Sequence, residues 1–122
     1  MQKPITPAMH GAIDYATSAA VALAPGMLDF PAPARRLFHS LAGSYTALSS
    51  VTDYPASLKR VVPFRAHGAT EAAIGFALPF LPRLLGFEHH RAARNACYGL
   101  AAITFVVAAL TQWDQYDASR LD

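Results

Sequence analysis

An internal repeat constrains the fold of this chain more than any other feature of its sequence. A shift of 57 residues places identical residues on one another along the first and third quarters of the chain. They are His10, Gly11, Ala12, Ala16, Ala20, Pro25, Leu28 and Phe30, which fall on His67, Gly68, Ala69, Ala73, Ala77, Pro82, Leu85 and Phe87. A shift of 59 similarly matches Ala34, Arg35, Leu41, Ala42 and Thr52 with Ala93, Arg94, Leu100, Ala101 and Thr111. Such self-similarity indicates a duplicated supersecondary unit, so we expect two helical hairpins, about 7–54 and 64–113, in one domain, 1–122.

Charged residues are scarce throughout both copies. They make up 15% of the chain, against about 25% in soluble domains. Four segments, roughly 8–28, 37–52, 66–82 and 95–113, carry almost no charge, and each is near the ~20 residues that cross a bilayer. The sequence therefore predicts an all-α integral membrane domain, a bundle of four transmembrane helices. Because each hairpin would cross twice, a pseudo-twofold axis along the membrane normal should relate the two copies. A small soluble bundle with unusually few charges is the alternative.

Each copy places a histidine four residues before a carboxylate near the start of its first helix. The pairs are His10 with Asp14 and His67 with Glu71, and this spacing puts both members on one helix face. If Thr6 caps the first helix, Asp14 lies about 12 Å along the axis. Capping and the helix dipole act only within the first turn. We therefore expect both carboxylates to face the bundle interior and to find partners there.

The expected topology brings the ends of the second and fourth helices to these two pairs. The sequence thus predicts a buried cluster at one end of the bundle, formed by His10, Asp14, Asp53, His67 and Glu71 and supported by Tyr15, Tyr54 and Gln112. The second helix also carries a polar stripe at helical spacing, His39, Thr46 and Ser50, which leads to the cluster. The fourth helix has no equivalent stripe.

Several short motifs resemble a known family. The stretches HGAIDY (10–15), TDYP (52–55) and HGATE (67–71), with a proline near the end of the first helix, resemble small four-helix bacterial membrane proteins of the SPW-repeat type. The Ser-Pro-Trp signature itself is absent, since LAPGML and FLPRLL stand at those points. The resemblance implies a multi-pass protein of the bacterial cytoplasmic membrane and supplies no activity.

The sequence favours a structural role. Buried polar groups need partners in any bundle, so the cluster is expected to hold helices together in an accessory protein surrounded by lipid. Such a protein could belong to a larger membrane complex or form a homo-oligomer. A net charge of +2 without a basic patch argues against nucleic acid as a partner. No nucleophile elbow, phosphate loop or zinc-protease motif is present, so no catalytic residue is assigned, and whether the chain is an enzyme stays open.

Three alternatives remain for the cluster, although the absence of any cofactor is the favoured expectation. His10, His67, Asp14 and Glu71 form a plausible ligand set for a transition metal. The polar stripe could carry a proton from His39 toward Asp53. A haem held by both histidines is the third alternative, because Gly11 and Gly68 would let a macrocycle approach.

Overall fold

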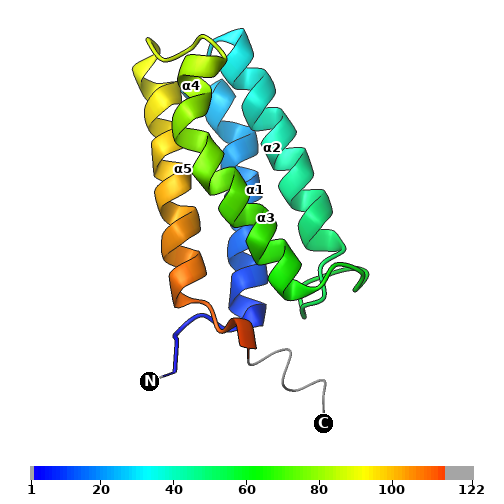
Figure 1. Ribbon diagram of the computed structural model, residues 1–122. Helices are drawn as coiled ribbons and strands as arrows, with labels where there is room; N and C mark the ends of the chain where they lie inside the picture. The colour runs from blue at the N-terminus through cyan, green and yellow to red at the C-terminus, as the bar shows by residue number, and fades with distance from the viewer. Residues whose placement is uncertain (1, 115–122) are drawn as a thin grey trace.

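The chain folds into a bundle of four helical segments, and the computed structural model describes residues 2–114 (Figure 1). The helices are α1 (Pro7–Met27), α2 (Ala32–Ser50), α3 (Phe64–Ala77), α4 (Leu81–Leu84) and α5 (Arg91–Leu110), with a 3₁₀ turn, η1 (Leu78–Phe80), between α3 and α4. Because η1 and α4 continue in the direction of α3, these three elements form one irregular helical segment. Helix α1 packs chiefly against α2, and α3 against α5, so the bundle consists of two hairpins.

The two hairpins use the same local devices at equivalent positions. Phe30 donates its N–H to the carbonyl of Pro25 at 3.0 Å, and Phe87 donates to that of Pro82 at 2.8 Å. Between these partners the chain reverses through a residue with positive φ, Asp29 at 51° in one copy and Gly86 at 82° in the other. Glycine adopts this conformation at no steric cost, and aspartate tolerates it better than most residues. The repeat therefore encodes the turns as well as the helices.

The repeat also places matched residues in the core. Ala34 and Ala93 are both fully buried, and Leu41 and Leu100 are both nearly so. At the end of the bundle opposite the hairpin turns, two short parallel β-bridges form, one between Ile5 and Thr111 and one between Thr52 and Val62. The first joins the residues before α1 to those after α5, and the second joins the residues after α2 to those before α3. They fix the end of the bundle where the paired histidines lie.

The prediction of four transmembrane helices, and with it of a multi-pass membrane domain, is wrong. Within residues 2–114, α5 alone is long and apolar enough to cross a membrane. Helix α1 contains His10 and Asp14, α2 begins with two arginines and is rich in serine, and α3 ends after 14 residues at Ala77. Counting charges along each segment overlooked these polar residues and the break in α3.

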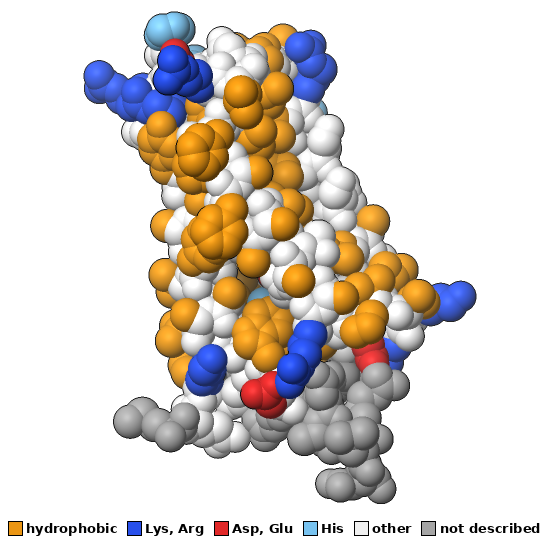
Figure 2. Space-filling model, viewed as in Figure 1, with side chains coloured by type: hydrophobic (Ala, Val, Ile, Leu, Met, Phe, Trp, Pro, Cys, Tyr) orange, Lys and Arg blue, Asp and Glu red, His pale blue; other side chains and the backbone are white. Residues whose placement is uncertain are grey.

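Large hydrophobic side chains remain exposed on the bundle surface. Figure 2 shows them spread over the face that α3 and α5 form, between two ends where Lys and Arg side chains gather. They include Phe76, Phe80, Leu84, Ile103 and Val106, each more than half exposed. An apolar surface of this kind marks a site of contact with another apolar phase or partner.

Gly11 allows close packing whereas Gly43 does not need to, which gives a test of the fold. A Cβ at Gly11 would lie 2.5 Å from the Cβ of Ala56, whereas a Cβ at Gly43 would meet nothing within 4 Å. We expect Gly11→Ala to destabilise the protein by about 1–3 kcal/mol through overpacking. Gly43→Ala should stabilise it by up to about 1 kcal/mol through helix propensity. Thermal unfolding of the two variants should shift in opposite directions; equal shifts would contradict the packing described.

Candidate functional site

The two histidine–carboxylate pairs meet at one point between α1 and α3. His10 Nε2 lies 3.4 Å from Asp14 Oδ1 and 3.2 Å from Glu71 Oε2. His67 Nε2 lies 2.9 Å from Asp14 Oδ2 and 3.0 Å from Glu71 Oε1. Each carboxylate thus directs one oxygen at each imidazole, and the four groups form a closed ring. We call these four residues the His–carboxylate cluster; each offers a ligand atom, and these atoms lie within 4.8 Å of one another.

Two threonines fix the tautomer of both imidazoles. Thr52 Oγ1 donates to the carbonyl of Leu48 at 2.6 Å, and Thr111 Oγ1 donates to that of Val107 at 2.6 Å. A hydroxyl has one proton, so each threonine oxygen can only accept at its second contact. These second contacts are His67 Nδ1 at 2.7 Å and His10 Nδ1 at 2.9 Å. Both Nδ1 atoms therefore carry hydrogen, and both Nε2 atoms face the carboxylates.

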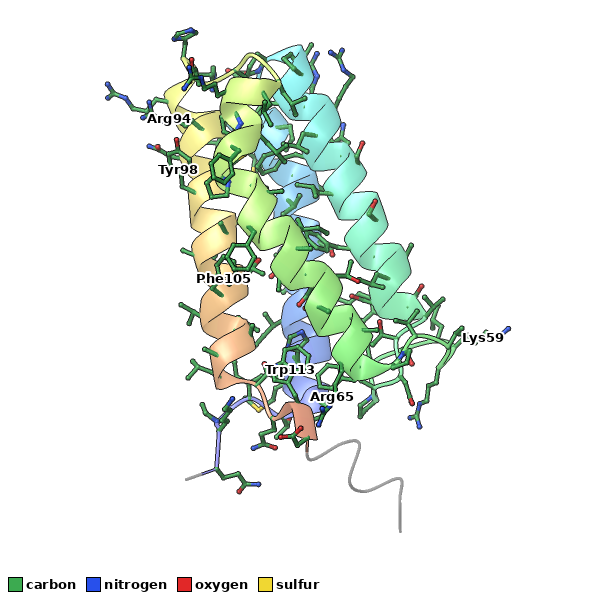
Figure 3. All side chains as sticks on the ribbon, in the orientation of Figure 1. Lys59, Arg65, Arg94, Tyr98, Phe105 and Trp113 are labelled. Carbon is green, nitrogen blue, oxygen red and sulfur yellow. The ribbon has the colours of Figure 1, made fainter. Side chains whose placement is uncertain are left out.

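Aromatic side chains close the cluster toward the end of the bundle. The ring of His10 packs edge-on against Phe64 at 5.3 Å and against Trp113 at 5.0 Å, and Tyr54 lies 5.4 Å from His67. Figure 3 shows Trp113 lying over the lower ends of the helices. This cover removes the cluster from bulk water, and His10 and His67 are almost completely buried.

The same packing argues against haem. Gly11 and Gly68 were expected to let a macrocycle approach the histidines. Instead, a Cβ at Gly11 would strike Ala56, and one at Gly68 would lie 2.6 Å from the indole of Trp113. Neither glycine faces open space, so the residues present do not fit a porphyrin between these helices.

The supporting residues predicted from the sequence take different places. Tyr54 donates its hydroxyl to Asp14 Oδ2 at 3.1 Å, so it contacts the cluster directly. Tyr15 donates to the carbonyl of Ala56, and Gln112 donates to that of Lys3, so both bond the backbone instead. Asp53 is buried nearby and donates its N–H to Val62, but it does not belong to the group of four that could share an ion.

The polar stripe on α2 does not enter the interior, so the burial of its residues gives no support to a proton path along it. His39 and Thr46 are exposed, and Ser50 is half-buried with its hydroxyl on the carbonyl of Ala47. The buried face of α2 carries Phe38 and Tyr45 instead. Burial of the aromatic side chains rotates the small polar residues outward.

Sequence reasoning missed the functional contacts of three residues, Thr52, Thr111 and Tyr45. The two threonines are identical residues at equivalent positions of the repeat, which was the available signal. Tyr45 is buried on α2, and its hydroxyl has no hydrogen-bond partner among residues 2–114. The equivalent residue in the second copy is Thr104. Because the two residues differ, the comparison of the two copies did not single out this position.

Burial and mutual charge shift the pKa values of the cluster in opposite directions. Burial alone would lower the pKa of His67, but hydrogen bonds to Asp14 and Glu71 and their negative charge raise it to about 9. Burial alone would raise the pKa of Glu71, but bonds from the two histidines and their positive charge lower it to about 2. For Asp14 burial prevails, and the neighbouring charge of Glu71 adds to it, so its pKa is raised. The cluster holds two positive and two negative charges when fully ionised.

The same four groups could together hold a divalent metal ion. Each offers one ligand atom, two imidazole nitrogens and two carboxylate oxygens, and these atoms lie within 4.8 Å of one another. Two neutral imidazoles, two carboxylates and a dication carry no net charge, just as two imidazolium ions and two carboxylates do. In metalloproteins a ligating histidine donates its other N–H to a fixed acceptor, and Thr52 and Thr111 provide such acceptors.

Comparison of the chain with protein-family models, with curated proteins and with solved structures finds no match. The resemblance to SPW-repeat proteins therefore receives no support and carries nothing further.

The shifted pKa values predict how the stability of the metal-free protein depends on pH. The raised pKa of His67 stabilises the fold fully below its usual value of 6.5, and this contribution is lost as the pH rises through about 9. The lowered pKa of Glu71 stabilises the fold above its usual 4.5, and this is lost as the pH falls toward 2. The raised pKa of Asp14 acts in the opposite sense to Glu71, because its contribution is lost as the pH rises above 3.8. Thermal unfolding in chelator should therefore show a Tm that falls as the pH rises from about 6.5 to 9.

The alkaline side of this profile should depend on His67. His67→Gln should flatten the fall in Tm between pH 6.5 and 9, because the residue no longer releases a proton on unfolding. His89→Gln is the matched control, since His89 is exposed, and it should leave the profile unchanged. An unaltered profile in His67→Gln would show that the cluster is not ionised as described.

Proposed function

We propose that this protein binds one divalent transition-metal ion through Nε2 of His10 and His67 and the carboxylates of Asp14 and Glu71. The observation that carries this proposal is the tautomer that the two threonines impose. With both Nδ1 atoms donating to Thr111 and Thr52, each Nε2 faces two carboxylates, which are themselves acceptors. Each Nε2 therefore needs a cation beside it, which is either its own proton or a metal ion shared with the carboxylates.

Either a proton on each Nε2 or a shared metal ion can supply the positive charge. Two protons leave an ionic cluster that only joins helices, which is the accessory role expected from the sequence. A metal ion replaces both protons at no change in net charge. Two nitrogen and two carboxylate ligands suit zinc, iron or manganese. The exclusion of water by the aromatic cover further favours tight binding, because ligand charges act strongly in a medium of low dielectric constant.

Metal analysis separates the two roles. Protein purified without chelator should contain close to one equivalent of a divalent transition metal, or should take up one equivalent of added Zn²⁺ in a calorimetric titration. His10→Ala combined with His67→Ala should abolish this uptake. If the wild-type protein takes up no Zn²⁺ while the double variant fails to fold, the cluster has the structural role instead.

The two threonine contacts give a finer test that leaves every ligand in place. Thr52→Val and Thr111→Val remove the acceptors of the Nδ1 hydrogens while keeping the side-chain shape. Loss of such a contact typically lowers metal affinity about 10–100-fold. Thr46→Val is the matched control, since Thr46 also donates to the carbonyl four residues earlier but lies exposed on α2. Equal Zn²⁺ affinities in all three variants would remove the main support for the proposal.

We further propose that lipid covers the exposed apolar face of α5. This helix of 20 residues carries its charges, Arg91 and Arg94, at its first turn. Only 22% of its most apolar stretch is buried within the bundle, and exposed Ile103 and Val106 lie on it. At 1.5 Å per residue its length is about 30 Å, which equals the thickness of the hydrocarbon core of a bilayer.

Fractionation of cells tests the lipid contact. The wild-type protein should remain with membranes after an alkaline carbonate wash, and should need detergent to stay monodisperse. Ile103→Lys combined with Val106→Lys should release it, because each charge in the hydrocarbon region costs roughly 2.5–3.5 kcal/mol. Thr46→Lys, on an exposed polar position of α2, should not. A wild-type chain that is monodisperse in plain buffer would overturn this proposal.

A further inference from the structure

A small cavity adjoins the His–carboxylate cluster on the side away from the aromatic cover. It measures about 20 Å³ and lies between α1 and α5, with walls from Ile13, Thr17, Leu100, Ile103, Thr104 and Val107. Asp14 and Glu71 form its polar wall. One water molecule needs roughly 10–15 Å³, so the cavity has room for a single water or an anion of that size beside the two carboxylates.

Tyr45 of α2 also lines this cavity. Tyr45 is 6% exposed, and its hydroxyl has no hydrogen-bond partner within the described residues. Leaving a buried hydroxyl unpaired costs about 1–3 kcal/mol, so buried groups of this kind require an explanation. A phenol is protonated at neutral pH, so Tyr45 has a hydroxyl proton to donate.

The two copies of the repeat carry different residues at one position that lines the cavity. The residue equivalent to Tyr45 in the second hairpin is Thr104, which lines the same cavity. Thr104 uses its proton on the carbonyl of Leu100 at 2.8 Å, whereas Tyr45 keeps its own available. An ionic cluster that only joined two equivalent hairpins would need no such donor on one side.

We propose that the cavity is the site of an exchangeable ligand of the metal ion, a water, hydroxide or monatomic anion, which accepts a hydrogen bond from Tyr45. This inference rests on the proposed metal site and adds an open coordination position to it. Ions with four protein ligands and no further position are structural, whereas catalytic ions keep a position for water or substrate. The carboxylates that would hold the ion also line the cavity, so a ligand inside it would lie beside them.

Cobalt and fluoride test the open position. Co²⁺ reports its coordination by visible absorption, and fluoride matches the size of the cavity. The wild-type protein should bind one Co²⁺, and fluoride should then change the absorption bands as the coordination changes. Tyr45→Phe should bind Co²⁺ within about threefold of wild type, but fluoride about tenfold more weakly, as expected for loss of a hydrogen bond to a charged ligand. Thr104→Val is the matched control and should bind both like wild type.

Each contrary result has a separate meaning. If wild-type protein binds no Co²⁺, the metal site itself fails and this inference fails with it. If Co²⁺ binds but fluoride leaves its spectrum unchanged, the metal site stands and the open position is wrong. If Tyr45→Phe binds fluoride as tightly as Thr104→Val and wild type do, the hydroxyl of Tyr45 does not contact the ligand.

Discussion

Two buried carboxylates can share one pair of imidazoles only if two positive charges accompany them. Burial of an unpaired carboxylate costs several kcal/mol, and Asp14 and Glu71 each lie within 3.4 Å of both Nε2 atoms. The rest of this end of the bundle follows from that requirement. Glycines let Tyr54 and Trp113 pack closely over the helices, and the aromatic rings exclude the water that would otherwise weaken the charges. The two threonines complete the arrangement because they leave each Nε2 pointing inward.

The hydrogen bonds of the cluster cross between the two hairpins. His10, in the first copy, donates to Thr111 of the second copy, and His67 donates to Thr52 of the first. Packing between helices is most extensive within each hairpin, so these crossed bonds and the two parallel bridges fasten one hairpin to the other. A change that removes the cluster is therefore expected to loosen the join between the copies before it unfolds either hairpin. The proposed metal site and the join between the hairpins therefore depend on the same few contacts.

The sequence predicted part of this arrangement for identifiable reasons. The repeat correctly indicated which residues approach one another, because duplicated hairpins bring equivalent helix ends to one end of the bundle. It did not indicate which face of α2 turns inward, since burial of Phe38 and Tyr45 decides this and leaves Thr46 exposed. Low charge suggested four membrane crossings, but it could not detect that α3 breaks at Ala77 or that serine and histidine make α2 polar. The threonines were visible as a matched pair, yet their role depends on distances that no spacing rule supplies.

The two copies of the repeat differ around the His–carboxylate cluster. These differences bear on whether the cluster binds a ligand or only joins helices. Asp14 accepts a hydrogen bond from Tyr54, whereas the equivalent Trp113 donates to the carbonyl of Ala108. The longer side chain of Glu71 is also the more exposed, at 13% against 8% for Asp14. Glu71 is therefore the more accessible of the two carboxylates. Tyr45 lines the same cavity as Glu71, and its buried hydroxyl has no hydrogen-bond partner within the described residues. The proposed exchangeable ligand would give this hydroxyl an acceptor beside Glu71.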